Sequence, residues 1–363
     1  MTIQDIKSVF SKFEVSGSWL EGAPTGSGHI HGTWLIQTTD KNHKGYILQK
    51  INNKVFPPVK EMMDNIHLVT THIKGKNREG GMQVLEIINT VGGKNHLTDH
   101  NGNYWRLYRR IFPGFSYDTV PNENVACEAG KAFGQFIADL RDLPAGLIFP
   151  VIPGFHSVEM RYENFRKAVN SDLKGRVEEV RNEIYFANSQ IDNMRLIPRM
   201  EKEGKLPVRI THNDTKLNNV LFDENDNAVC VIDLDTVMPG LSLYDFGDTI
   251  RTAANTGEED EAELENIQFS MPVFKAFADG FLERTISFLS PEEIELLPLA
   301  SQYMTYIMGI RFLTDYIDGD LYYSTHYEKQ NLRRCRAQFR LMESMMDKYR
   351  ESQEIISDLA KKY

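Results

Sequence analysis

The 363-residue sequence has no long hydrophobic run, few cysteines and fewer basic than acidic residues. No stretch approaches the ~18–20 apolar residues that a membrane-spanning helix needs, so we expect no transmembrane segment. The first residues, Met1 to Asp5, lack a charged segment followed by an apolar one, and no signal peptide is predicted. The three cysteines are far apart and form neither a disulfide framework nor a zinc-spaced cluster. This pattern indicates a reducing compartment, and we expect a cytoplasmic protein.

The charge balance excludes one class of partner. Lys and Arg together number 41 and Asp and Glu 51, which gives a formal net charge of −10. A protein that coats nucleic acid needs basic surfaces for the phosphates, so we expect no nucleic-acid partner, although a small anion can still bind in a local positive site. The hydrophobic fraction of 41% supplies a sizeable core. Since one domain takes ~100–200 residues, two domains or lobes are expected.

Predicted strands dominate the first hundred residues. Segments 33–38 and 46–51 read as a hairpin, and further strands are predicted at 83–90 and 104–112. A helix is predicted over 59–73 from its apolar spacing. After residue 112 helical patterns take over, interrupted by two short β-like runs. The helices are predicted at 124–143, within 161–200 and from 258 to the end, including an amphipathic stretch at 327–363, and the β-like runs at 209–211 and 229–232.

These patterns predict an α+β protein with two lobes. A small, antiparallel β-rich N-terminal lobe spans residues 1–111, and a larger, mainly helical C-terminal lobe spans 112–363. A short hinge near 111–114 joins them. We expect a ligand in the cleft between the lobes, because such clefts commonly hold small molecules.

The most informative stretch is the polar loop that contains Asp214. Asn219 follows five residues later, and Asp233 ends a buried-looking strand a short distance on, with Asp235 beside it. An aspartate that leaves a strand into a loop can reach a cleft while its backbone stays anchored. The structural alternative is a polar loop held by Asx turns.

Phosphoryl transfer needs such a set of side chains. Mg²⁺ takes oxygen ligands, so the amide of Asn219 and the carboxylate of Asp233 suit it. A second carboxylate, that of Asp214, can orient an acceptor hydroxyl and take its proton. His-x-Asp-x-x-x-x-Asn, followed by Asp after a hydrophobic strand, matches the catalytic loop and metal aspartate of kinase-like folds. We therefore predict Asp214 as the catalytic base and Asn219 and Asp233 as metal ligands.

A glycine-rich segment precedes the first predicted hairpin. Gly26, Ser27 and Gly28 allow backbone N–H groups to approach phosphates, although the spacing is one residue longer than Gly-x-Gly-x-x-Gly. Lys50, on the second strand of the hairpin, is placed as a phosphate-binding lysine would be. Its neighbour Gln49 faces the other side of the strand, and the register is open by one residue.

Two acidic residues in the following helix are candidates to pair with Lys50. They are Glu61 and Asp64, and the sequence does not choose between them. The histidines of the glycine-rich segment, His29 and His31, form no metal-like pattern. We expect them to face solvent or to bond to the backbone.

The sequence resembles the aminoglycoside phosphotransferase-like (choline kinase-like) branch of the protein kinase fold, and within it the bacterial N-acetylhexosamine 1-kinases. The resemblance spans most of the chain and lies chiefly in residues 211–219, 232–240 and 244–251, with support from 26–30, 46–52, 104–106 and 309–316. It implies a kinase that uses ATP and Mg²⁺ to phosphorylate the anomeric hydroxyl of N-acetylglucosamine or N-acetylgalactosamine.

The resemblance also implies roles for single residues. Asp214 would orient the sugar hydroxyl as the base, and Asn219 and Asp233 would bind Mg²⁺. Asp235 would lie at the metal or substrate edge. Lys50 would contact the nucleotide phosphates, which Gly26 and Gly28 would cover, while backbone groups of 109–114 would hold the adenine.

Two departures from protein kinases matter. The second motif reads Asp233-Leu234-Asp235 instead of Asp-Phe-Gly, and no Ala-Pro-Glu element follows, which argues against a protein substrate. The later Asp245-Phe246-Gly247 lies too far downstream for the metal role. We predict that it starts a helix and braces the catalytic loop, with the Asp245 carboxylate bonded to backbone.

Arg311 and Asp315 share one face of a predicted helix, four residues apart. One interpretation is a surface ion pair; the resemblance instead implies a wall of the sugar pocket, and both residues are therefore candidate substrate contacts. Four aromatic residues are candidates to stack against a sugar, with burial in the core as the alternative for each: Tyr316, Tyr322, Tyr323 and Trp105.

Two other functions remain open at this stage. The acceptor can instead be an amino alcohol, homoserine or an aminoglycoside, with identical chemistry and a different pocket. A non-catalytic nucleotide-binding protein is disfavoured because Asp214, Asn219 and Asp233 are all present. A sulfate-removing enzyme is excluded because no Cys/Ser-x-Pro-x-Arg modification site occurs. The exact sugar, the choice of ATP or GTP and the oligomeric state stay open, with a monomer as the expectation.

Overall fold

The computed structural model describes residues 2–26, 30–76 and 81–363, in two compact units. The first unit comprises Met1–Ser116, Asp139–Ile152 and Asn219–Pro239. The second unit comprises Tyr117–Ala138, Pro153–Asn218 and Gly240–Tyr363. Within the described residues, no helix combines the length and apolar character needed to cross a membrane.

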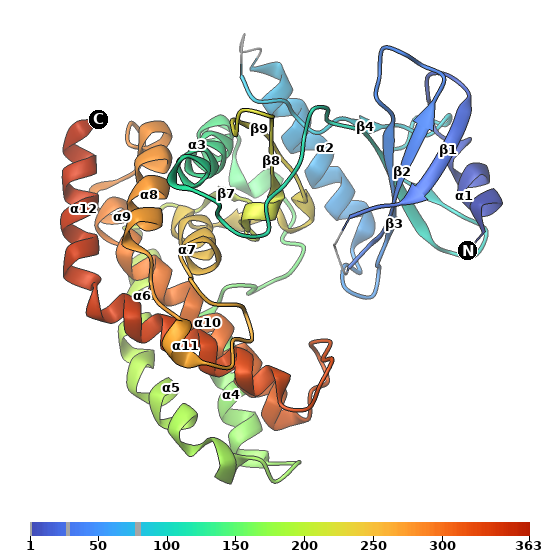
Figure 1. Ribbon diagram of the computed structural model, residues 1–363. Coiled ribbons are helices and arrows are strands. Elements are labelled where there is room, and N and C mark those ends of the chain that lie inside the picture. Colours follow the sequence, from blue (N-terminus) through green and yellow to red (C-terminus); the bar gives the residue numbers. More distant parts are fainter. Residues whose placement is uncertain (1, 27–29, 77–80) are drawn as a thin grey trace. The chain divides into compact units, whose positions relative to one another are not determined.

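An antiparallel sheet forms the centre of the first unit (Figure 1). The order of its strands is β1-β2-β3-β6-β4, and β5 also pairs with β6. The predicted hairpin is confirmed, since β2 and β3 pair with Trp34 opposite Leu48. The strands are β1 Trp19–Pro24, β2 Gly32–Thr38, β3 Tyr46–Ile51, β4 Ile87–Ile88, β5 Leu97–Thr98 and β6 Tyr104–Arg109.

One face of this sheet carries the hydrophobic core of the first unit. Helix α1, Ile3–Phe10, starts with a capping box at Thr2 and buries Ile6 and Phe10. These side chains pack in one cluster with Leu48 and Trp105 from the sheet. Because side chains alternate along a strand, the residues between those of the cluster face the opposite side. The opposite face is therefore available to other segments of the unit.

The remaining elements of the first unit are a helix between β3 and β4 and segments from later in the sequence. Helix α2, Val59–Gly75, buries Met62, Met63 and Ile66 and matches the predicted helix at 59–73. A second hairpin, β8 and β9, pairs Val220 with Val231. The bounds of the other elements are η1 Ala145–Leu147, β8 Val220–Phe222, β9 Ala228–Val231, the 3₁₀ helix η4 Leu234–Thr236 and, reaching the end of the unit, β10 Met238–Gly240.

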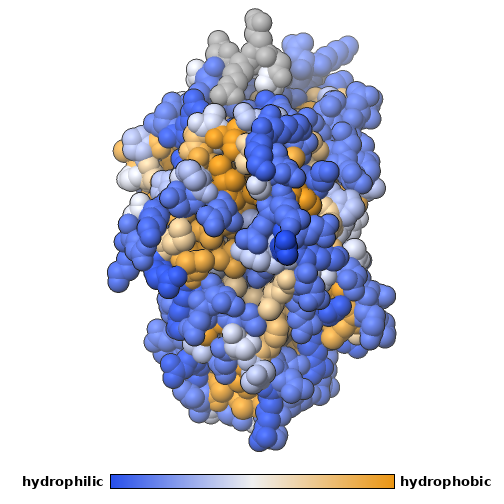
Figure 2. All heavy atoms as spheres, turned by 90° about the vertical axis from the view of Figure 1, so that its left-hand side faces the viewer, coloured by the Kyte–Doolittle hydropathy of each residue, from blue (hydrophilic) through white to orange (hydrophobic). Residues whose placement is uncertain are grey.

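The second unit is mainly helical, as predicted. Its longest helix, α10, Leu297–Asp318, is buried over most of its length. The other elements are α3 Glu123–Leu140, α4 Val158–Ser171, η2 Val177–Val180, α5 Arg181–Met194, α6 Leu196–Lys202, β7 Arg209–Thr211, η3 Leu217–Asn219, α7 Ser242–Ala253, η5 Leu264–Asn266, α8 Met271–Thr285, α9 Pro291–Glu295, α11 Gln330–Asp347 and α12 Tyr349–Lys362. Figure 2 views the C-terminal helices from the side on which α12 lies in Figure 1 and shows mostly hydrophilic residues with apolar patches between them.

Close helix contacts in the second unit depend on glycine. A Cβ on Gly280 of α8 would lie 2.0 Å from the carbonyl oxygen of Cys127 in α3. A Cβ on Gly247 of α7 would lie 2.2 Å from the carbonyl oxygen of Ala300 in α10. Real Cβ atoms do not approach backbone so closely, so these helix pairs need glycine at both positions.

Two predicted elements differ from the observed ones. The strand predicted at 83–90 is reduced to Ile87–Ile88, because the backbone N–H of Gln83 bonds to the carbonyl of Val229 in the second hairpin instead of joining the sheet. The amphipathic stretch 327–363 forms two helices, α11 and α12, which meet at Lys348.

Candidate active site

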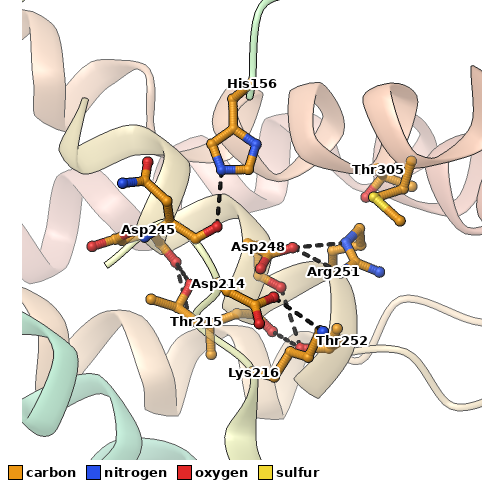
Figure 3. A network of polar contacts seen from close by, with 12 residues as sticks. His156, Asp214, Thr215, Lys216, Asp245, Asp248, Arg251, Thr252 and Thr305 are labelled. Carbon is orange, nitrogen blue, oxygen red and sulfur yellow. Dashed lines mark hydrogen bonds and ion pairs between the residues drawn. The ribbon is translucent and has the colours of Figure 1, made fainter. Parts of the chain in front are cut away.

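The Asp214 carboxylate lies in a loop that follows β7. Its Oδ1 is 3.0 Å from Nζ of Lys216, and the Asp214 side chain is 24% exposed (Figure 3). Burial raises the pKa of the Asp214 carboxyl, but Lys216, with smaller contributions from His212 and Arg251, lowers it, and the net pKa is lowered. Asp214 is therefore ionised near neutral pH and can accept a hydrogen bond from an acceptor hydroxyl.

Asp245 holds the loop from the start of α7. Its carboxylate accepts the backbone N–H of His212 at 2.8 Å and of Asn213 at 2.7 Å. Its own carbonyl accepts the hydroxyl of Thr215 at 2.6 Å. The prediction that Asp245 braces the catalytic loop through the backbone is confirmed. Burial raises the pKa of the Asp245 carboxyl to about 6.

His156 supports the same loop from the segment before α4. Its Nε2 donates to the carbonyl of Asn213 at 2.9 Å, while its Nδ1 is buried and has no hydrogen-bond partner. Burial lowers the pKa of His156 to about 4, because a charged imidazole would have no acceptor at Nδ1. Asn213 itself adopts a left-handed backbone, with φ of 66°, which asparagine tolerates better than most residues. The backbone directly before Asp214 is thus fixed on two sides.

Asn219 and Asp233 come together in the first unit, at one end of the β8–β9 hairpin. The N–H of Ile232 donates to the carbonyl of Asn219 at 2.9 Å, which places Asp233 one residue from this pair. Asn219 is buried, whereas Asp233 is exposed. Asp233 has a left-handed backbone with φ of 61°. Such a conformation costs free energy and turns the side chain out of the strand direction.

This pair of side chains suits a magnesium ion. One amide oxygen and one carboxylate are the oxygen ligands that Mg²⁺ takes, with water and phosphate oxygens completing its shell. Within the described residues, no group of three or more His, Cys, Asp or Glu side chains is arranged to hold a metal. A magnesium site at the hairpin would therefore depend on oxygens from the nucleotide.

Asp235 is buried in an ion pair with Arg106 of β6. Nη1 and Nη2 of Arg106 reach the two carboxylate oxygens of Asp235, the second at 3.0 Å, and both side chains are less than 3% exposed. Nε2 of His31 lies 2.5 Å from Oδ2 of the same carboxylate. Burial raises the pKa of Asp235, but Arg106 and His31 outweigh it and the net pKa is lowered. Sequence reasoning gave Arg106 no role, since 129 residues separate it from Asp235.

Lys50 lies on the face of the sheet opposite to the face that carries Arg106. It pairs across the strands with Gly32 and Trp105, on the face of the hydrophobic core. Gln49 pairs with Arg106 on the other face. In the described part of the chain the Lys50 ammonium forms no ion pair, and Asp64 instead accepts from Lys60 and Asn95.

The glycine-rich segment is described only in part. Gly26 has a left-handed backbone, with φ of 83°, two residues after the end of β1. This conformation favours glycine. Ser27 and Gly28 lie outside the described residues.

A cavity of about 460 Å³ opens in the second unit between α4, the end of α10 and the segment after it. Its lining is rich in cationic and aromatic side chains. They include Arg161 and Lys167 from α4, Arg311 from α10, and Tyr322 and Tyr323 from the following segment. The volume falls in the range of small-molecule sites, ~300–1,000 Å³.

The two arginines of the cavity have no carboxylate partner among the described residues. The guanidinium of Arg311 lies over the rings of Phe155 and Tyr323, each 5.5 Å away, and that of Arg161 donates to the carbonyl of Phe155. Burial lowers the pKa of Arg161 to about 10, and the charge of Arg311 adds to this. Their remaining N–H groups suit oxygen atoms of a ligand.

Asp315 lines the cavity but is occupied by backbone. Its carboxylate accepts the N–H groups of Leu321, Tyr322 and Tyr323 at 2.7–2.9 Å and the side-chain amide of Asn331 at 2.8 Å. A surface ion pair between Arg311 and Asp315, one of the two interpretations, is wrong: Asp315 is buried and fastens the tyrosine segment to α10.

Residues 21–277 match the phosphotransferase enzyme family (APH), which is well over half of the chain. The chain belongs to this family. It is therefore a phosphotransferase of the group whose members act on hydroxyl-bearing small molecules. The expected family is confirmed at this level, whereas the N-acetylhexosamine 1-kinase subtype remains a prediction.

Solved structures show proteins of similar fold. A microcompartment-associated aminopropanol kinase is 13% identical with a TM-score of 0.65, over 98% of this chain and 99% of that one. An aminoglycoside phosphotransferase from Alicyclobacillus acidocaldarius is 11% identical with a TM-score of 0.63, over 100% and 97%. A spectinomycin phosphotransferase in complex with ADP and spectinomycin is 13% identical with a TM-score of 0.59, over 99% and 98%. These likenesses confirm the predicted α+β kinase-like fold.

Proposed function

We propose that the protein is an ATP- and Mg²⁺-dependent kinase that phosphorylates the anomeric hydroxyl of an N-acetylhexosamine. The observation that supports the chemistry is the braced loop that carries the Asp214 carboxylate, and the backbone hydrogen bond from Ile232, next to Asp233, to Asn219 supports the metal role of the hairpin. The chain order, with Asn219 five residues after Asp214, is that of a kinase catalytic loop.

Asp214 acts on the acceptor in this proposal. Its carboxylate accepts a hydrogen bond from the hydroxyl and orients the oxygen in line with the terminal phosphorus of ATP. The oxygen–phosphorus bond forms as the bond to the leaving ADP breaks, and the hydroxyl proton passes to the Asp214 carboxylate. Lys216, 3.0 Å away, keeps that carboxylate ionised before transfer.

Asn219 and Asp233 are the proposed magnesium ligands. Bound Mg²⁺ would neutralise charge on the phosphate oxygens of the nucleotide. Gly26 with Ser27, Gly28 and Lys50 is proposed to contact the nucleotide, and backbone groups of 109–114 to hold its base. In this view residues 1–111 form the nucleotide lobe and 112–363 the acceptor lobe.

The charge of the cavity supports a neutral acceptor. Arg161, Lys167 and Arg311 line it, the carboxylate of Asp315 is already satisfied, and Asp318 is the other acidic side chain of the lining. An ammonium group on an amino alcohol or an aminoglycoside would meet net positive charge there. Hydroxyl and carbonyl oxygens of an N-acetylhexosamine would accept the arginine N–H groups.

Two predicted substrate contacts act indirectly in this proposal. Asp315 holds the segment that carries Tyr322 and Tyr323, so it shapes the cavity wall while Arg311 touches the acceptor. Asp235 is buried against Arg106 and acts through the turn that it shares with Asp233. All three cysteines are free, which fits the proposed cytoplasmic location, and we propose a monomer.

An acceptor panel tests the proposal. The protein, ATP and Mg²⁺ are incubated separately with N-acetylglucosamine, N-acetylgalactosamine, ethanolamine, aminopropanol, homoserine and an aminoglycoside, and ADP formation is followed. We expect acceptor-dependent ADP release with the N-acetylated sugars. Release only with the amino compounds would assign the protein to the alternative acceptors, and nucleotide binding without release on the whole panel would support a non-catalytic protein.

A further inference from the structure

The turn that carries Asp233 is held from two sides within the first unit. On one side Asp235, two residues after Asp233, accepts hydrogen bonds from Arg106 and His31. On the other side Asn65 of α2 donates to the carbonyl of Val237 at 3.2 Å and, at 2.7 Å, to the carbonyl of Phe149. Asp233 itself is exposed and precedes both anchored residues, in a left-handed conformation with φ of 61°.

The hydrogen bonds fix which nitrogen of His31 carries its proton. The backbone N–H of Asn52 points to Nδ1 of His31 at 3.0 Å. A backbone N–H only donates, so Nδ1 is the unprotonated acceptor and Nε2 carries the hydrogen. The 2.5 Å contact to Asp235 is therefore a hydrogen bond donated by Nε2 of His31. His31 thus accepts a hydrogen bond from Asn52, the residue after β3, through Nδ1 and donates one to Asp235 through Nε2.

Arg106 also forms a hydrogen bond within the sheet, in addition to its ion pair with the turn. Its Nε donates to Oε1 of Gln49 at 2.8 Å, and Nε2 of Gln49 donates to the hydroxyl of Thr33 at 3.2 Å. Neighbouring strands β2, β3 and β6 thus each contribute one member of a chain of polar contacts that ends at Asp235. The network is buried at Arg106 and Asp235 and half-buried at Gln49 and Thr33, and such a chain of hydrogen bonds favours one arrangement of the groups it joins.

The two carboxylates of the turn differ in burial, since Asp235 is buried and Asp233 is exposed. Arg106 is buried with a single bidentate carboxylate partner, Asp235. Asp235 is buried and already accepts N–H hydrogen bonds from Arg106 and His31, whereas Asp233 is exposed and is the carboxylate of this turn that a cation can reach. Lys50, on the other face of the sheet, takes no part in the arrangement.

We propose that His31, Arg106 and Asp235 are positioning residues that set the geometry of Asp233 as a ligand for a nucleotide-bound divalent cation. The inference rests on the proposed function only for the metal role of Asn219 and Asp233, and not on which acceptor is used. Outer partners that orient metal ligands typically change metal affinity or activity ~10–100-fold when they are removed.

Two substitutions at His31 separate positioning from general stability. His31→Gln keeps a donor at the place of Nε2, for Asp235, and loses the acceptor for Asn52. His31→Asn keeps an acceptor at the place of Nδ1 and loses the donor to Asp235. Asp235→Asn and Arg106→Lys complete the set, and Arg195→Gln, in an exposed bidentate pair with Glu159, is the control.

The measurement is the binding of Mn²⁺ in the presence of ADP, which is detected as a loss of the electron paramagnetic resonance signal of free Mn²⁺. Circular dichroism confirms that each variant is folded. We expect the dissociation constant of Mn²⁺ to rise about 10-fold or more in His31→Asn and Asp235→Asn. It stays close to wild type in His31→Gln and Arg195→Gln. In steady-state kinetics the KM for the metal–nucleotide complex rises, while the KM for the acceptor does not.

Equal Mn²⁺ affinity in wild type, His31→Asn and Asp235→Asn would overturn the inference. A similar loss in His31→Gln and His31→Asn would do so as well, because it would locate the effect at Asn52 rather than at Asp235. Should the wild-type protein bind no Mn²⁺ with ADP, the metal role itself fails. Normal binding and the expected losses, together with no acceptor phosphorylated, would instead uphold the positioning role and refute only the proposed acceptor.

Discussion

The carboxylate of Asp245 accepts the backbone N–H of Asn213 at 2.7 Å, one residue before Asp214. The same carboxylate also accepts the N–H of His212, so one side chain fixes the two peptide groups that precede Asp214. The loop backbone is held by bonds that do not involve the Asp214 carboxylate. A change at Asp245 is therefore predicted to affect both stability and catalysis.

Replacing Asp245 by alanine leaves two backbone N–H groups without their acceptor. Each such buried group costs about 1–3 kcal/mol, so we expect a clear loss of unfolding free energy in urea titrations. Turnover should fall as well, because the loop no longer presents Asp214 in one position. Asp245→Asn keeps one acceptor oxygen and should lose less on both counts; equal stability of Asp245→Ala and wild type would contradict the brace.

Asp214→Asn removes the proposed base and preserves the shape of the side chain. A positioned base contributes ~10²–10⁴-fold, so we expect kcat to fall by about that factor while the fold survives. Asp192→Asn, at an exposed carboxylate in α5, is the matched control and should leave the rate unchanged. Unchanged turnover in Asp214→Asn would end the assignment of Asp214.

His156 makes the protein sensitive to acid. Its pKa in the folded protein is lowered to about 4 from 6.5, so its contribution to stability is complete above about pH 6.5 and is lost as the pH falls toward 4. The full loss amounts to roughly 3 kcal/mol for a shift of this size. Unfolding free energies measured from pH 7 to pH 4 test this expectation.

The control for His156 is His156→Gln, which keeps a donor for the carbonyl of Asn213 and does not titrate in this range. The stability of wild type relative to His156→Gln should decrease steadily as the pH is lowered. Parallel pH profiles for the two proteins would show that the buried imidazole does not titrate on unfolding.

Arg311 is predicted to hold the acceptor by its guanidinium. A hydrogen bond from a charged group is worth ~1.5–3 kcal/mol, so Arg311→Gln should raise the KM for N-acetylglucosamine about 10-fold or more, with little change in the KM for ATP. Arg350→Gln, at an exposed arginine of α12, is the control. An effect on the KM for ATP alone would remove Arg311 from the acceptor site.

The sequence predicted the elements whose signals are local. The hairpin at 33–38 and 46–51, the helix starting at Val59 and the brace at Asp245 all rest on short patterns, and the structure has each of them. The break between α11 and α12 at Lys348 was not predictable, because neither glycine nor proline marks it.

The face of Lys50 could not be read from its strand. Tyr46 to Ile51 has apolar residues on both sides of the strand, so alternation does not say which side meets the core. The structure places Leu48 and Lys50 on the side of α1. The Arg106–Asp235 pair was equally hidden, because it joins residues that no local pattern connects.

The most direct test of the account is a ³¹P nuclear magnetic resonance spectrum of the protein incubated with ATP, Mg²⁺ and N-acetylglucosamine. The account predicts a new phosphate resonance coupled to the anomeric proton of the sugar, appearing with ADP and absent with Asp214→Asn. A spectrum in which ATP is consumed only with an amino alcohol or aminoglycoside, or a sugar phosphorylated at another hydroxyl, would contradict it.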